Sequence, residues 1–214
     1  ERPQQGQADD HQPDGGGLQE LDKSTMSARG TILGTRQTDW LKESLLESTA
    51  HWNVLAQQVL MAMIHLKSEK GHGYPMDKWP GYTRDRLQLV EFIHERQIPN
   101  PIVLTGDIHC NWVNNLRVDD RQSETPVVAT EFVGTSISSG GNGEERRNNW
   151  EEVTKDNPCV QFYNGERGYV RCTVTPELWQ TDFRVVEDVT KPGATAKTRA
   201  TFVVEAGEPG AKQA

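Results

Sequence analysis

Two segments of the chain carry hydrophobic residues at helical spacing. Apolar positions repeat with this period between Thr38, which can cap a helix N-terminus, and Leu46. The segment 83–97 shows the same period, which predicts an amphipathic helix. Pro99 and Pro101 follow directly and would end this second helix.

Short continuous apolar runs elsewhere predict strands. The run 102–105 follows the second predicted helix, as a buried inner strand of an α/β sheet would, and 126–134 is another strand candidate. The segment 52–64 begins like a buried strand, and periodicity does not decide between strand and helix for its second half. Clean alternation over 169–174, followed by an apolar run at 201–206, predicts further strands. We therefore expect an α/β fold with a β-rich C-terminal third.

Polar segments divide the chain into regions. Residues 1–30 contain few apolar side chains and a run of three glycines, so we expect an exposed loop or a disordered segment. The polar stretch 135–158 predicts a long loop with a short helix around Trp150. The last residues, 207–214, predict a frayed tail. These limits leave 31–206 as the folded domain.

The composition and net charge of the chain exclude several classes of function. The chain has 214 residues, 23 Lys plus Arg and 31 Asp plus Glu, for a formal net charge of −8. This balance argues against binding to duplex nucleic acid and against binding to anionic membrane surfaces. Apolar runs stay well below the ~18 residues that a membrane span needs, and the start of the chain shows no signal-peptide pattern. The hydrophobic fraction of 34% is low, so we expect that part of the chain is unfolded or that a neighbour completes its core.

Three cysteines carry little information on their own. Cys110, Cys159 and Cys172 are widely spaced and form neither a CxxC motif nor a zinc-binding pattern. They can be buried or incidental thiols. A disulfide between Cys159 and Cys172 is the alternative in an oxidising compartment.

The segment Gly106-Asp107-Ile108-His109 is the first candidate for chemistry. It follows the predicted inner strand 102–105, and ligands of open α/β sheets bind beyond the carboxyl ends of strands. Aspartate supplies hard oxygen ligands and histidine an imidazole nitrogen, so Asp107 and His109 can hold metal ions if the turn breaks the strand alternation. Such ions polarise phosphoryl oxygens and activate water. The alternative is a strand-end turn in which Asp107 acts as a cap and His109 is exposed.

A second candidate cluster spans 77–86. Trp79 and Tyr82 flank a glycine and can wall a pocket, and Arg86 can bind an anion through two parallel hydrogen bonds. In the alternative interpretation, the aromatic rings pack on the core and Arg86 forms a surface ion pair.

The third candidate is the Gly-rich segment 134–141, which includes Ser136. Hydroxyl groups and backbone N–H groups of such a loop can contact phosphate. The segment lacks the spacing and the lysine of a nucleotide-binding P-loop. A flexible turn without a ligand is the alternative.

Several motifs follow one another in the order found in PhoD-type alkaline phosphatases, and the resemblance covers roughly Gly30 to Val189. These motifs are TILG-x-x-Q-x-x-WL from Thr31, WNVLAQQV from Trp52, W-x-GY-x-x-x-R from Trp79, LTGDIH-x-x-W from Leu104, EFVGTSISS from Glu131 and RGYV from Arg167.

The resemblance implies a calcineurin-like metallophosphoesterase fold, which is a β-sandwich flanked by helices. It implies metal-dependent hydrolysis of phosphate mono- and diesters at a site with iron and calcium, in proteins exported to the periplasm or cell surface. By this resemblance, the catalytic metal ligands would be Asp107 and His109, with Gln58 as a further ligand. The residues near the substrate would be Trp79, Tyr82, Arg86 and Ser136.

This chain also departs from the family pattern. The upstream metal motifs of the family, an Asp/Cys motif, a GD motif and an acidic DDH-like motif, do not occur in it, and Pro80 replaces an aspartate common in the family. We therefore expect the C-terminal half of a PhoD-like enzyme, which needs the missing N-terminal half and is inactive alone. A non-catalytic β-rich module or an inactive remnant is the alternative. A preference for diesters or phospholipids over monoesters also stays open.

Overall fold

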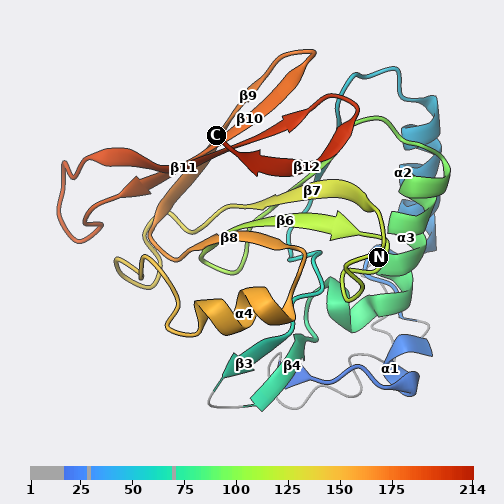
Figure 1. Cartoon of the computed structure of the whole chain (residues 1–214), viewed down its shortest axis with the longest axis horizontal. Coiled ribbons are helices and arrows are strands. Elements are labelled where there is room, and N and C mark those ends of the chain that lie inside the picture. Colours follow the sequence, from blue (N-terminus) through green and yellow to red (C-terminus); the bar gives the residue numbers. More distant parts are fainter. Residues whose placement is uncertain (1–16, 28–29, 69–70) are drawn as a thin grey trace.

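The computed structural model describes residues 17–27, 30–68 and 71–214 (Figure 1). Its helices are α1 (Lys23–Ser27), α2 (Thr35–Glu47), α3 (Thr83–Glu95) and α4 (Trp150–Asp156), and a 3-10 turn, η2, covers Trp79–Tyr82. The first eight strands are β1 (Leu18–Gln19), β2 (Asn53–Ala56), β3 (Leu66–Ser68), β4 (Gly71–Pro75), β5 (Pro101–Thr105), β6 (Asn111–Arg117), β7 (Val127–Val133) and β8 (Val160–Asn164). The C-terminal strands are β9 (Gly168–Val174), β10 (Leu178–Val186), β11 (Ala196–Glu205) and β12 (Glu208–Gln213).

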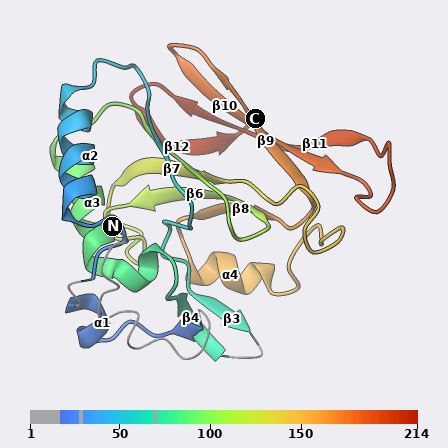
Figure 2. The same cartoon turned by 180° about the vertical axis from the view of Figure 1, so that it is seen from behind.

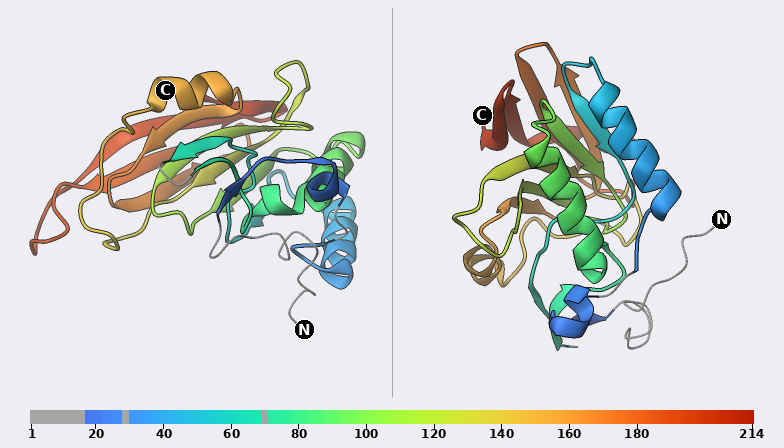
Figure 3. Two further views of the ribbon diagram at one scale, coloured as in Figure 1. Left: turned by 90° about the horizontal axis from the view of Figure 1, so that it is seen from below. Right: turned by 90° about the vertical axis from the view of Figure 1, so that its right-hand side faces the viewer.

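Two sheets dominate the fold. The central sheet has the strand order β2-β5-β7-β6-β8, in which β2, β5 and β7 are parallel and the β6 pairings are antiparallel. The C-terminal sheet is antiparallel and has the order β12-β11-β10-β9. The right panel of Figure 3 shows this sheet, the central sheet and the pair α2 and α3 as successive layers. A small sheet, β1-β4-β3, lies at the lower end in Figure 1.

The core has two parts, one on each face of the central sheet. Aromatic residues of β10 and β11, including Phe183 and Phe202, pack against Val113 and Phe132 of the central sheet. On the opposite face, α3, α4 and the buried segment 60–64 cover Trp112 and its neighbours. Figure 2 shows the two sheets with α3 and α4 from behind. The expected α/β sandwich flanked by helices, with a β-rich C-terminal third, is confirmed.

Several element boundaries differ from the sequence-based expectation. Helix α2 starts at Thr35, before the expected cap Thr38, because Gly34 adopts φ 74 and its N–H donates to the Thr31 side chain at 3.0 Å. The segment 57–65 is neither strand nor helix, although Leu60 to Ile64 are buried.

The C-terminal segment 207–214 is not a frayed tail. Gly207, at φ 83, turns the chain so that β12 pairs with β11. Ala211 is buried, and its N–H donates to the side-chain oxygen of Asn115 on β6 at 2.8 Å. These contacts supply the long-range partners that the composition of the segment does not reveal.

At the other end of the chain, the expected loop 1–30 lies partly outside the described residues. Within the described part, 17–27 forms strand β1, paired with β4, and helix α1. None of the helices in the parts of the chain that the structure describes is long and apolar enough to cross a membrane.

The alternative of a Cys159–Cys172 disulfide is wrong. All three cysteines are free thiols. Cys159 is buried in the core part that faces the helices, whereas Cys172 lies on β9 and packs against the core part between the sheets. The central sheet therefore separates the two sulfur atoms.

Candidate functional site

The carboxyl ends of the parallel strands β2, β5 and β7 meet at one edge of the central sheet. The N–H of Gly106, after β5, donates to the carbonyl oxygen of Gln58, after β2, at 3.2 Å. The N–H of Gly134, after β7, donates to the carbonyl oxygen of Thr105 at 2.8 Å. Gln58, the turn 106–109 and the Gly-rich segment therefore lie side by side, where ligands of such sheets bind.

The turn 106–109 has an unusual backbone. Asp107 has φ 72 and His109 has φ 52, in the left-handed region that residues other than glycine rarely adopt, although aspartate and histidine are enriched there. The side chains of both residues are exposed. The turn thus breaks the strand alternation, as Asp107 and His109 require in order to serve one site.

A positive charge already contacts Asp107. The Nζ atom of Lys78 lies 2.6 Å from Oδ2 of Asp107 and 3.0 Å from Oδ2 of Asp77. Partial burial lowers the pKa of Lys78, but the hydrogen bonds to Asp107 and Asp77 outweigh it, so the pKa lies above its ordinary value. Lys78 belongs to the predicted cluster 77–86, but the sequence assigned it no role of its own.

The side chains at this edge of the sheet include two possible metal ligands. Asp107 offers carboxylate oxygens at a position that the Lys78 ammonium shows to be favourable for a cation, and His109 adds an exposed imidazole. Among the described residues, however, His, Cys, Asp and Glu side chains form no group of three or more that could hold a metal. Asp107 and His109 alone therefore do not make up such a group.

Arg167, the first residue of the RGYV motif, holds the backbone of the turn, a role that the sequence did not predict. Its Nη1 atom donates to the carbonyl oxygens of His109 at 2.7 Å and Gly165 at 2.6 Å. Its Nη2 atom donates to the carbonyl oxygen of Gly140 at 3.3 Å. One buried guanidinium therefore ties the turn 106–109 to the Gly-rich loop.

Trp79 does not wall a pocket, because its side chain is only 2% exposed and belongs to the core. Its indole N–H donates to Oε1 of Gln57 at 3.0 Å, and Nε2 of Gln57 donates to Oγ1 of Thr105 at 2.5 Å. Trp79 thus supports the loop that carries Gln58. Tyr82 is half-buried at the junction of η2 and α3.

Arg86 is placed differently from the expectation that it binds substrate. Its side chain is fully buried, and Nη2 donates to Oδ2 of Asp120 at 2.6 Å, while Nε donates to the carbonyl oxygen of Met61 at 2.9 Å. The alternative of an ion pair is therefore correct, but the pair is in the core rather than on the surface. These contacts make Arg86 a structural residue.

Ser136 lies in the loop after β7, at the same edge as the turn 106–109. The side chain is half-buried, and its hydroxyl group donates to the carbonyl oxygen of Ser139 at 3.0 Å. The carbonyl oxygen of Ser136 accepts the N–H of Gly168 at 3.1 Å. Ser136 thus lies in a loop at the same sheet edge as Gln58 and the turn 106–109, whereas Arg86 and Trp79 lie in the core.

A fully buried carboxylate, Glu131 on β7, supports the same edge from inside. Its Oε1 atom accepts from the N–H of Met61 at 2.7 Å and the hydroxyl of Thr105 at 2.7 Å. Its Oε2 atom accepts from the N–H of Ala62 at 3.0 Å and Nδ2 of Asn114 at 3.0 Å. Burial raises the pKa of Glu131, although these four donors favour the charged form.

Glu131→Gln is expected to lower the free energy of unfolding by about 1–3 kcal/mol. The amide NH₂ of glutamine would face N–H donors and leave at least one of them unpaired in the core. Urea titration followed by circular dichroism measures the change, and Glu124→Gln at an exposed position is the matched control. An equal stability of the two variants would contradict the role of Glu131.

Comparisons with known proteins agree with the sequence resemblance. A family model described as PhoD-like phosphatase matches residues 3–183. The chain is 46% identical over 183 residues to alkaline phosphatase D of Bacillus subtilis (strain 168), an alignment that covers 86% of this chain and 31% of that protein. A solved structure of PhoD superposes with a TM-score of 0.87 at 42% identity, and the match covers 94% of this chain and 39% of that chain. The chain thus spans between about a third and two-fifths of the length of these relatives.

Proposed function

Because the chain belongs to the PhoD-like phosphatase family, we propose that it supplies part of the active site of an enzyme that hydrolyses phosphate mono- and diesters. The observation that carries this proposal is the exposed turn 106–109 at the carboxyl edge of the parallel strands. Asp107 and His109, both left-handed and exposed, carry the carboxylate and the imidazole of this turn.

In this proposal, Asp107 and His109 hold metal ions, iron and calcium by resemblance, and Gln58 lies beside them as a further ligand. A bound metal ion polarises a phosphoryl oxygen and lowers the pKa of a bound water. Carboxylate oxygens suit calcium, and the imidazole nitrogen suits a transition metal such as iron.

Other residues of the chain position these ligands. Arg167 fixes the carbonyl oxygen of His109 and so the backbone from which the imidazole projects. Lys78 holds Asp107 through an ion pair and contributes positive charge next to the place where an anionic phosphate would bind. Ser136 provides a hydroxyl at the same edge.

The remaining ligands come from a longer protein in this proposal, so the chain alone is inactive. Exposed apolar side chains support a covering partner segment: Trp40 is 61% exposed and Leu46 is 55% exposed on α2. Val54, on the edge strand β2, is 42% exposed. By the same resemblance, the longer protein is exported to the periplasm or cell surface.

A chimera tests the proposal. The matching segment of the Bacillus subtilis relative is replaced by this chain, and hydrolysis of p-nitrophenyl phosphate and bis-p-nitrophenyl phosphate is followed at alkaline pH. We expect the chimera to hydrolyse at least one of the two substrates and the separate chain to hydrolyse neither. A folded chimera without activity would contradict the proposal and favour a non-catalytic β-rich module.

A further inference from the structure

We propose that Thr105, the last residue of β5, is a positioning residue that couples the loop carrying Gln58 to the turn 106–109. The coupling is a property of this chain alone, and its role toward metal ions rests on the proposed function. Thr105 lies two residues before Asp107, and its side chain is buried. Its hydroxyl group joins a hydrogen-bond chain that begins at Trp79 and ends at Glu131.

The partners of the Gln57 side chain fix the orientation of its amide group. Its Oε1 atom accepts from the backbone N–H of Val59 at 3.1 Å and from the indole N–H of Trp79 at 3.0 Å. Both of these groups can only donate, so the amide oxygen faces them and the NH₂ group faces Thr105. Because the bond to Val59 closes around Gln58, it holds the backbone on both sides of that residue.

The Thr105 hydroxyl group connects this amide to a buried carboxylate. Its Oγ1 atom accepts from Nε2 of Gln57 at 2.5 Å and donates to Oε1 of Glu131 at 2.7 Å. The NH₂ group of Gln57 can only donate, so the hydroxyl hydrogen is directed at Glu131. A valine at position 105 would have a similar shape but could make neither hydrogen bond.

Backbone hydrogen bonds on either side of this link join the same two segments. The N–H of Gln57 donates to the carbonyl oxygen of Leu104 at 3.0 Å. The N–H of Gly106 donates to the carbonyl oxygen of Gln58 at 3.2 Å. With the side-chain bond from Gln57 to Thr105 between them, three successive links join the end of β2 to the end of β5.

The coupled residues lie behind the proposed metal ligands. The side chain of Thr105 is 8% exposed and that of Gln57 is half-buried. The side chains of Gln58, Asp107 and His109, which follow them along the chain, are exposed. Hydrogen-bonding groups behind metal ligands hold the ligands in place and typically change metal affinity by about 10- to 100-fold. The geometry therefore makes the Thr105 hydroxyl a determinant of metal affinity.

The chain contains a matched threonine outside this hydrogen-bond chain. Thr130, on the neighbouring strand β7, is fully buried, and its hydroxyl oxygen has no hydrogen-bond partner among the described residues. It precedes Glu131 and therefore points to the opposite face of the sheet. Thr130→Val makes the same substitution as Thr105→Val without removing a link between the two segments.

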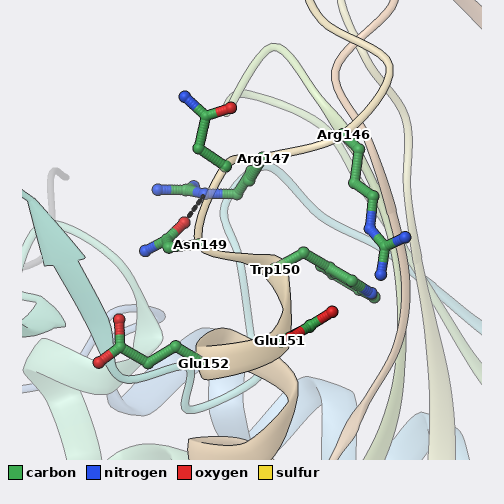
Figure 4. Close-up of a pocket in the computed structure, with 7 residues that line it drawn as sticks. Arg146, Arg147, Asn149, Trp150, Glu151 and Glu152 are labelled. Atoms are coloured by element: carbon green, nitrogen blue, oxygen red, sulfur yellow. Dashed lines mark hydrogen bonds between the residues drawn. The ribbon is translucent and has the colours of Figure 1, made fainter.

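The surface hollow at the start of α4 provides a second control. Its lining comes from one run of consecutive residues, and the guanidinium groups of Arg146 and Arg147 lie on opposite sides of the loop (Figure 4). The guanidinium carbon of Arg146 lies 5.7 Å from the centroid of the Trp150 ring. Its side chain is exposed, so Arg146→Gln is a control for changes on the surface.

NMR relaxation of the separate chain in EDTA tests the coupling without metal or hydrolysis. We expect the order parameters of the Gln58 and Val59 N–H groups to fall in Thr105→Val from about 0.85 toward about 0.6. Thr105→Ser keeps the hydroxyl group and should restore the higher values, and Thr130→Val and Arg146→Gln should leave them unchanged. Order parameters describe motion in the native state, so a purely stabilising role of Thr105 would not change them. Equal values in Thr105→Val and the unchanged chain would overturn the coupling.

Calcium titration of the chimera by calorimetry tests the role toward metal ions. We expect Thr105→Val to bind calcium about tenfold more weakly than the unchanged chimera. Thr105→Ser, Thr130→Val and Arg146→Gln should bind like the unchanged chimera. Equal affinity of the Thr105→Val variant would overturn the positioning role. An unchanged chimera that binds no calcium would overturn the proposed function instead, and the order parameters of the separate chain would still decide the coupling.

Gln57→Met keeps the test decisive if Thr105→Val does not fold. Gln57 is half-buried, and methionine has a similar length but cannot form the bonds to Thr105, Trp79 and Val59. The same loss of order around Gln58 and the same weaker calcium binding are expected. Unchanged order parameters and unchanged calcium affinity in this variant would overturn the proposal.

Discussion

Replacing Asp107 by asparagine in the chimera is expected to lower kcat/KM for p-nitrophenyl phosphate by about 10³-fold. Asparagine keeps the size of the side chain but removes the negative charge, so a metal ion loses an anionic oxygen ligand. Removing an outer-shell partner of a metal ligand typically lowers metal affinity or activity about 10- to 100-fold. Loss of a direct ligand should therefore lower activity further. Steady-state kinetics at saturating metal concentration measures the effect.

Asp77→Asn is the matched control for this prediction. Asp77 contacts the same Lys78 ammonium as Asp107, but it lies outside the turn 106–109. We expect its loss to change kcat/KM by less than about threefold, because a half-exposed ion pair contributes little. If both variants lose activity equally, or if Asp107→Asn keeps full activity, Asp107 is not a metal ligand.

Replacing Arg86 by methionine is expected to lower the free energy of unfolding by about 3–5 kcal/mol. The variant leaves the carboxylate of Asp120, which is fully buried, without its positive partner. Asp120 cannot turn to solvent, because it also accepts the N–H groups of Met63 at 2.9 Å and Arg117 at 2.6 Å. For a domain of this size the loss corresponds to a melting temperature lower by about 10 °C.

Differential scanning calorimetry measures this change, with Arg84→Met on the exposed side of α3 as the control. We expect the control to stay within about 0.5 kcal/mol of the unchanged chain. Unchanged stability of Arg86→Met would contradict the structural role of the buried Arg86–Asp120 pair.

The sequence predicted the features that depend on local patterns. Helix α3 and strand β5 follow from periodicity and from a short apolar run, both of which act within one segment. The position of the turn 106–109 followed from the same reasoning, because the end of a buried strand places the next residues at a sheet edge. The left-handed φ values of Asp107 and His109 agree with that interpretation.

Features that depend on distant partners could not be predicted in this way. The partner of Arg86 is Asp120, on another element, so the sequence could not separate a core ion pair from an anion-binding arginine. The burial of Trp79 depends on packing against several distant segments. The polar segment 207–214 becomes strand β12 because β11 offers an edge and Asn115 a hydrogen bond.

The metal content of the purified chimera, measured by mass spectrometry, tests most directly whether the turn 106–109 holds metal ions. We expect bound iron and calcium in the chimera and in its Asp77→Asn variant. We expect a clear loss of metal in the double variant Asp107→Asn/His109→Gln with an unchanged fold. Full metal content in the double variant would contradict the assignment of the turn 106–109 as part of a metal site.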